Sequence, residues 1–165
     1  MKKSIYFVLI LLLIAAVASG YYWYITRDRR MVVRLVKDVV SLLEKKPSNL
    51  PHAGVLKYTK VDDCFDHSVK LYCPKPSFDA VKSREELKAM YALVNKYIDE
   101  MHVEVENVEV GIVGKEAVFS FDAEFSGVVG GRKEDFDNVY QVSGTAVKKD
   151  GKWWVSSLIA EEIIQ

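Results

Sequence analysis

Two cysteines, an aspartate and a histidine lie within one short stretch of this chain, and these residue types can bind metal, do redox chemistry or form a disulfide. The stretch DDCFDHSVKLYCPKP, residues 62–76, holds Cys64, Asp66, His67 and Cys73, and the chain has no other cysteine. The spacing Cys-x-Asp-His-x5-Cys matches no closed zinc motif and is not the CxxC of a thioredoxin-type site. In an exported domain, two such cysteines most simply form a disulfide. We therefore expect a Cys64–Cys73 disulfide, with two thiols or a metal site as the alternatives.

The N-terminal segment determines whether this stretch is exported. Residues 5–25, IYFVLILLLIAAVASGYYWYI, carry no charge over 21 positions. A helix of that length reaches about 30 Å, the thickness of a bilayer core, and the aromatic residues at 21–24 are typical of a membrane interface. The AVA at 16–18 leaves a cleaved signal peptide, cut after Ala18, as the alternative. Either interpretation places the rest of the chain outside the cytoplasm, as a single-pass membrane protein or a secreted one.

Two helical patterns follow the N-terminal segment. We assign residues 1–30 to the anchor and its flank, and residues 31–165 to one α+β domain. Apolar residues recur with helical spacing over 31–46 and again over 83–101. A capping box that begins at Ser83 marks the start of the second helix. Between the two helices, GVLKYTKV and SVKLYC are expected to be short strands.

After residue 101 the apolar period changes from 3.6 to 2, which predicts strands. A phase slip at Glu106–Asn107 indicates a bulge, and Asp150–Gly151 indicates a tight hairpin turn. The glycine pair within 126–137 predicts a long, mobile loop. Four antiparallel strands after a long helix predict a meander that helices cover on one face. The expected strands are 103–113, 116–127, 137–149 and 152–164.

This order of elements resembles the NTF2-like and cystatin-like α+β folds. The last strand, DGKWWVSSLI, is similar to the closing strand of many NTF2-like domains, in which Gly-Lys-Trp is followed by alternating apolar residues. The resemblance covers roughly residues 31–164 and implies helices packed on a curved antiparallel sheet that encloses a pocket. With the N-terminal segment, the expected fold is a transmembrane helix followed by this α+β domain. Such domains include isomerases, dehydratases, transport factors and the periplasmic domain of a membrane-anchored secretion component. The family has no universal catalytic motif, so the resemblance assigns no site residues.

A few titratable residues could supply acid or base chemistry. Asp122 and Glu124 share one face of a strand, where a solvated surface is the simpler interpretation. His102 follows the long helix, where it would also suit the helix C-terminus. Asp122, Tyr140 or His102 could serve an isomerase- or dehydratase-like pocket. The motifs of P-loop proteins, zincins and serine hydrolases are absent from the sequence.

Aromatic residues mark a second kind of candidate site. A small apolar ligand could lie between the long helix and the sheet, near Tyr91, Tyr97, Phe119 and Phe121. Trp153 and Trp154 point to opposite faces of the last strand, so one belongs to the core and the other could meet a partner.

The charge balance narrows the function classes. Lys and Arg (23) equal Asp and Glu (23), so the surface has no basic excess with which to bind nucleic acid. We expect neither a metal nor another cofactor. The sequence favours a non-catalytic, membrane-tethered extracytoplasmic binding or assembly module, with a protein partner or a second copy in an envelope complex. The alternative is a pocket protein that binds a small apolar ligand or acts as an isomerase or dehydratase.

Overall fold

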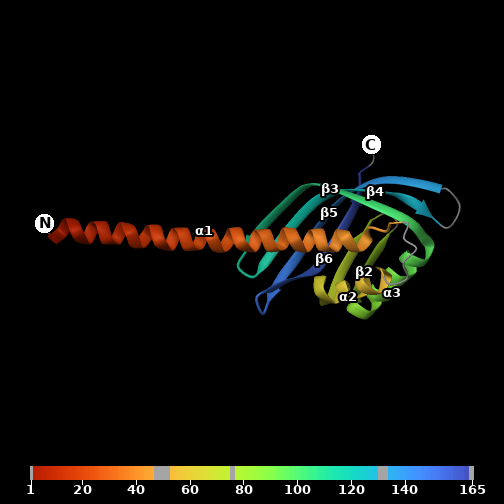
Figure 1. The fold of residues 1–165 in the computed structure, drawn as a ribbon, viewed down its shortest axis with the longest axis horizontal. Helices are drawn as coiled ribbons and strands as arrows, with labels where there is room; N and C mark the ends of the chain where they lie inside the picture. The colour runs from red at the N-terminus through yellow and green to blue at the C-terminus, as the bar shows by residue number, and fades with distance from the viewer. Residues whose placement is uncertain (1, 47–52, 75–76, 130–133, 164–165) are drawn as a thin grey trace.

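The computed structural model describes residues 2–46, 53–74, 77–129 and 134–163, which form three helices and one sheet (Figure 1). The helices are α1 (Lys2–Leu43), α2 (Ala53–Cys64) and α3 (Arg84–Tyr97). The strands are β1 (Phe65–Cys73), β2 (Phe78–Ser83), β3 (Ile98–Val113), β4 (Glu116–Val129), β5 (Glu134–Lys149) and β6 (Lys152–Glu162).

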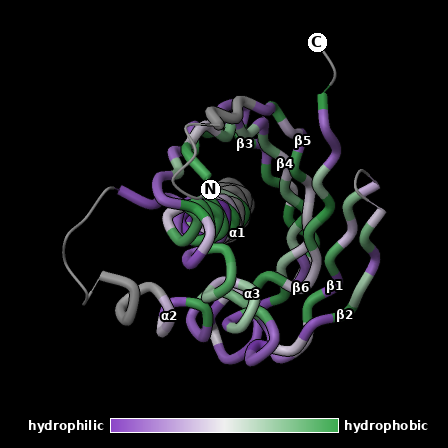
Figure 2. The backbone as a smooth tube through the Cα atoms, turned by 90° about the vertical axis from the view of Figure 1, so that its right-hand side faces the viewer, coloured by the Kyte–Doolittle hydropathy of each residue, from purple (hydrophilic) through white to green (hydrophobic). Residues whose placement is uncertain are grey.

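The sheet has the strand order β2-β1-β6-β5-β4-β3. It curves around the C-terminal half of α1, as the end-on view shows (Figure 2). The predicted α+β class and the meander β3-β4-β5-β6 are confirmed. The sheet is mixed rather than antiparallel throughout, because β1 pairs with β6 in parallel and with β2 antiparallel.

Local backbone signals in the meander follow the sequence. Pairing between β3 and β4 shifts register after Glu106, and Asn107 has a φ of 52°, as expected for the predicted bulge. Asp150 and Gly151 both have positive φ, 51° and 79°, which suits the tight turn between twisted strands. The prediction of a long loop at 126–137 is wrong for the described residues 126–129 and 134–137, because β4 and β5 stay paired as far as Val129 and Glu134.

Helix α1 is continuous over 42 residues and crosses the predicted boundary after residue 30. Its N-terminal part extends away from the sheet, and its C-terminal part lies inside the curve (Figures 1 and 2). Within the described part of the chain, no helix has a stretch long and apolar enough to cross a membrane. Much of the predicted span, including residues 5–13, has side chains that lie outside the described part, and the predicted anchor is not supported. The residues of α1 that enter the core are Val32, Leu35, Val36, Val39, Val40 and Leu42.

An ion pair fixes α1 to the β5–β6 hairpin. Asp28 is 1% exposed, and Nζ of Lys148 lies 2.8 Å from both of its carboxylate oxygens. The same ammonium donates to the hydroxyl of Tyr24 at 3.2 Å. The bond to Asp28 raises the pKa of Lys148, so this lysine is charged at neutral pH. We call this contact the α1 clamp.

The segment before α3 departs most from the sequence prediction. GVLKYTKV, expected to be a strand, is part of α2, while SVKLYC does lie in β1. Cys64 ends α2 and Cys73 ends β1, so about 30 Å of extended chain separates them. A disulfide needs Cα atoms within about 7 Å. Both cysteines are described and neither forms a disulfide, so the predicted Cys64–Cys73 bridge is wrong.

Candidate ligand-binding site

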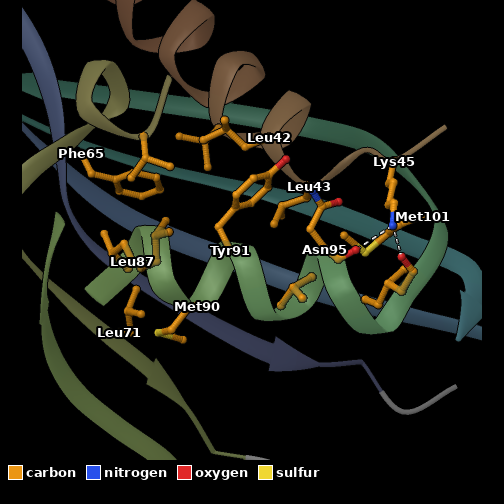
Figure 3. Close-up of a pocket in the computed structure, with 15 residues that line it drawn as sticks. Leu42, Leu43, Lys45, Phe65, Leu71, Leu87, Met90, Tyr91, Asn95 and Met101 are labelled. Atoms are coloured by element: carbon orange, nitrogen blue, oxygen red, sulfur yellow. Dashed lines mark hydrogen bonds between the residues drawn. The ribbon is translucent and has the colours of Figure 1, made fainter. Parts of the chain in front are cut away.

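Helix α3 has an amphipathic sequence, yet none of its residues, all of which the structure describes, is buried. Its start is well defined, because the hydroxyl of Ser83 accepts from the amide of Glu86 and the carboxylate of Glu86 accepts from the amide of Ser83. An apolar face normally packs against the core. Here the stripe faces a cavity instead of close-packed side chains (Figure 3).

This first cavity has a volume of about 220 Å³ and lies between α3, the end of α1 and the sheet. Nearly all of its wall is hydrocarbon. Three of its residues carry polar side-chain groups: Lys45, Tyr91 and Asn95. The apolar wall comprises Val39, Leu42, Leu43, Val61, Phe65, Leu71, Leu87, Met90, Val94, Ile98, Met101 and Leu158.

Lys45 connects the end of α1 to the end of α3. The amide of Lys45 donates to the carbonyl of Met101 at 2.7 Å, and the carbonyl of Lys45 accepts from the amide of Met101 at 2.9 Å. Its Nζ donates to the backbone carbonyl of Asn95 at 2.7 Å and also to that of Ile98 (Figure 3). A cation at these carbonyls stabilises the C-terminus of α3. An ammonium has three donors, so one N–H remains for a ligand.

Tyr91 brings a hydroxyl to the same cavity. Its ring projects from α3, and the hydroxyl points toward α1 near Leu42 (Figure 3). Burial raises the pKa of Tyr91, so the phenol stays protonated at neutral pH. It can therefore donate or accept a hydrogen bond, but it is a poor base.

A second apolar cavity of about 300 Å³ lies beside the first. The two share the side chains of Val39, Leu43, Leu71, Met90 and Leu158. The wall that belongs to the second cavity alone comprises Val40, Tyr72, Cys73, Phe78, Val103, Phe121, Phe125, Val142 and Ala160.

The aromatic residues singled out in the sequence fall in different places. Tyr91 lines the first cavity and Phe121 lines the second. Phe119 is buried and stacks on Phe121, with ring centroids 6.3 Å apart. Tyr97 is 58% exposed, at the end of α3.

The two tryptophans do lie on opposite faces of β6. Trp153 is 2% exposed and belongs to the core. Trp154 is partly exposed and lies between two cations, with Arg84 at 4.7 Å and Lys152 at 4.3 Å from its ring centroid.

The acid and base candidates do not line either cavity. Asp122 alternates with the buried Phe121 and so lies on the outer sheet face, where its carboxylate accepts from Asn107 at 2.7 Å. Glu124 shares that face. His102 is exposed on β3, beyond the end of α3, with its Nε2 3.4 Å from Glu104.

Tyr140 and Asp66 also lie away from the two cavities. Tyr140 packs edge-on against Phe125, with centroids 5.6 Å apart; burial, then Glu162 and Cys73, raise its pKa. Asp66 accepts two bonds from Lys149, at 2.8 and 2.7 Å. Among the described residues, no three His, Cys, Asp or Glu side chains group closely enough to hold a metal ion.

The sequence indicated the region of the two cavities, through Tyr91 and Phe121, but neither their full lining nor the role of Lys45. Leu71 and Leu158 look like ordinary core residues, and Lys45 looks like a solvated residue after a helix. The stripe on α3 was visible, but only the structure shows that the stripe faces empty space.

No family model and no curated protein matches this sequence. Solved structures do resemble it. A hexachlorocyclohexane dehydrochlorinase (LinA), type 2, superposes with a TM-score of 0.69 at 10% identity, over 84% of this chain and 87% of that one. A protein described as a scytalone dehydratase, from Novosphingobium aromaticivorans, superposes with a TM-score of 0.63 at 17% identity, over 84% of this chain and 86% of that one. An NTF2-like protein from Cytophaga hutchinsonii superposes with a TM-score of 0.62 at 15% identity, over 82% of this chain and 98% of that one.

These findings correct the predicted function. Two of the similar structures are named for a dehydrochlorinase and a dehydratase, and this chain has ligand-sized apolar cavities in its own fold. The prediction of a non-catalytic, membrane-tethered assembly module is therefore wrong, and the alternative, a pocket protein, is favoured. At these identities the comparisons establish architecture rather than activity: the chain has the NTF2-like α+β fold that its sequence resembles.

Proposed function

We propose that this protein binds a small, neutral, apolar molecule in the cavity beneath α3. One observation carries the proposal: the apolar stripe of α3 faces a cavity of about 220 Å³ instead of packed side chains. Protein interiors are normally close-packed, and atoms that line a void lose their dispersion contacts. An apolar ligand would restore those contacts.

The polar groups at the cavity favour one hydrogen-bonding oxygen on the ligand. Lys45 has one ammonium N–H left after its two bonds to carbonyls, and Tyr91 has a protonated hydroxyl. A few polar groups in an apolar wall are what orients a ligand in most small-molecule sites. A hydroxyl, ketone or ether oxygen near these two side chains would suit the site.

The wall also favours a ligand without charge. Among the described lining residues only Lys45 is formally charged, and two backbone carbonyls already face its ammonium. A charged group placed elsewhere in the cavity would lose its hydration without gaining a partner.

A lyase is the second candidate, because the similar structures include a dehydrochlorinase and a dehydratase. An elimination needs a base to remove a proton from the substrate. The described lining residues offer Tyr91 and Lys45 but no carboxylate or imidazole, and the raised pKa of Tyr91 makes it a donor rather than a base. Binding therefore accounts for this cavity better than elimination does.

Neighbouring residues of α3 provide a matched test. Both side chains are exposed, Val94 by 39% and Leu93 by 56%, but only Val94 lines the cavity. Val94→Phe should fill the cavity and weaken the binding of cyclohexanol and hexanol at least tenfold in calorimetric titrations, while Leu93→Phe should leave it unchanged. Equal effects of the two variants, or no binding of either alcohol to the wild type, would refute the proposal.

A further inference from the structure

We infer that the ligand is elongated and occupies both cavities, with a neutral oxygen function at one end and a hydrocarbon chain that passes beneath Met90. This inference rests on the proposed function and specifies the class of molecule.

The two cavities are separated by side chains from several different elements. Val39 and Leu43 come from α1, and Met90 comes from α3. Leu71 and Leu158 are direct partners in the parallel pairing of β1 with β6. Because these five residues line both cavities, each cavity begins where the other ends.

Met90 is the part of this division that can move most readily. Methionine is unbranched, with three rotatable bonds, and adapts its shape to its surroundings. It projects from α3, in which no residue is buried, so its side chain can change rotamer without disturbing close-packed neighbours. Leu71 and Leu158, in contrast, belong to paired strands and are branched.

The two cavities differ in polarity, and this difference orients the ligand. The first has Lys45 and Tyr91 at its wall. The second is almost entirely hydrocarbon: among its described lining residues only Tyr72 carries a side-chain oxygen, and only Cys73 and Met90 carry a sulfur. An oxygen function therefore belongs in the first cavity and a hydrocarbon tail in the second, so the chemistry is that of a long-chain alcohol, aldehyde or ketone.

A chain-length series tests the inference. Dissociation constants of straight-chain primary alcohols, from butanol to dodecanol, are measured by displacement of a fluorescent apolar probe. Each methylene that enters an apolar site should tighten binding about fourfold. We expect this trend to continue after the first cavity is full, because the tail then enters the second.

One substitution separates the two cavities. Ala160 lines only the second, so Ala160→Leu should stop the gain in affinity at long chain lengths and leave the short alcohols unaffected. Ala89→Leu, on the exposed side of α3, is the control and should leave the whole series unchanged. The methyl NMR signal of Met90 gives a readout that needs no variant: decanol should shift it more than butanol does.

The outcomes distinguish the two proposals. Affinity that stops rising at short chain lengths in the wild type, with an equal Met90 shift for all alcohols, overturns the two-cavity inference and leaves the proposed function standing. Absence of binding by every alcohol, or no effect of Val94→Phe on any of them, overturns the proposed function and the inference with it.

Discussion

Replacing Lys148 with methionine should lower the free energy of unfolding by about 3–5 kcal/mol, the usual cost of removing one partner from a buried ion pair. The α1 clamp is such a pair, because the side chain of Asp28 is 2% exposed and that of Lys148 is 15% exposed. Both oxygens of Asp28 lie 2.8 Å from the ammonium, so the substitution removes two charge-assisted hydrogen bonds at once. Methionine retains the length and most of the volume of lysine, so the main change is the unpaired carboxylate.

The neighbouring residue provides the control. Lys149 also pairs with an aspartate, Asp66, but its side chain is 53% exposed, and exposed pairs contribute about 1 kcal/mol or less. Urea denaturation followed by circular dichroism measures both variants, with the free energy extrapolated linearly to water. A second variant, Lys148→Met with Asp28→Leu, should recover most of the loss, because apolar residues of similar size can replace a buried ion pair.

A difference of less than about 1 kcal/mol between Lys148→Met and Lys149→Met would contradict this prediction, as would a double variant no more stable than Lys148→Met. Because the pKa of Lys148 is raised in the folded state, the stabilisation that comes from protonation of Lys148 is complete below about pH 10.4, the ordinary pKa of lysine. This stabilisation is lost as the pH rises through the higher folded-state value. The comparison should therefore be made near pH 7.

Three further predictions concern stability. Gly144→Ala should lower the free energy of unfolding, measured in urea, by about 1–3 kcal/mol or more, because the new Cβ would lie 2.6 Å from Cζ of Phe119. Gly111→Ala is the control and should have little effect, because its Cβ would meet nothing within 4 Å. Equal losses in the two variants would contradict this prediction. Burial, followed by two nearby aspartates, raises the pKa of Cys64 from 9.0 to about 11, so the folded state holds this proton more tightly. Stability should accordingly fall by about 2 kcal/mol more between pH 8 and pH 11 in the wild type than in Cys64→Ala, and parallel pH profiles would disprove it. Ser83→Ala should cost about 1 kcal/mol through loss of the helix cap, measured by thermal denaturation, and an unchanged Tm would show that the capping box is dispensable.

The elements that the sequence predicted well carry local signals. The capping box at Ser83 marks α3, and strict alternation along β4 reproduces its buried face, from Ala117 to Ala123. Positive φ at Asp150 and Gly151 follows from residue types that tolerate it. In these cases the deciding interactions lie within a few residues of one another.

The parts that the sequence did not predict depend on distant contacts. β1 was expected as a short strand, but its parallel pairing with β6 joins segments far apart in the chain, and no turn links them. α2 contains valine, tyrosine and threonine, which favour strands, yet burial of Val61 and Cys64 on one face holds it as a helix. The export signal read from residues 5–25 suggested a disulfide that the strand geometry excludes.

The candidate site was predictable only as a region. The sequence placed an apolar ligand between the long helix and the sheet, which is where both cavities lie. It did not identify which side chains line them, because a cavity is the space that side chains from separate elements leave unfilled. Tyr91 was visible as part of a stripe; Lys45 and Met90 acquire their roles only when α1, α3 and β6 come together.

Helix α3 is held at both ends and loosely packed along its length. The capping box fixes its first turn and Lys45 binds its last carbonyls, while no residue between them is buried. Local opening of a protein costs least where few apolar contacts are broken. The backbone amide of Met90 should therefore exchange with deuterium through a partial opening that leaves the sheet intact, whereas the amide of Phe121 should exchange only on global unfolding; equal protection would contradict this. Entry of a ligand would then be limited by the opening rate of one helix, and its association would be slower than diffusion allows.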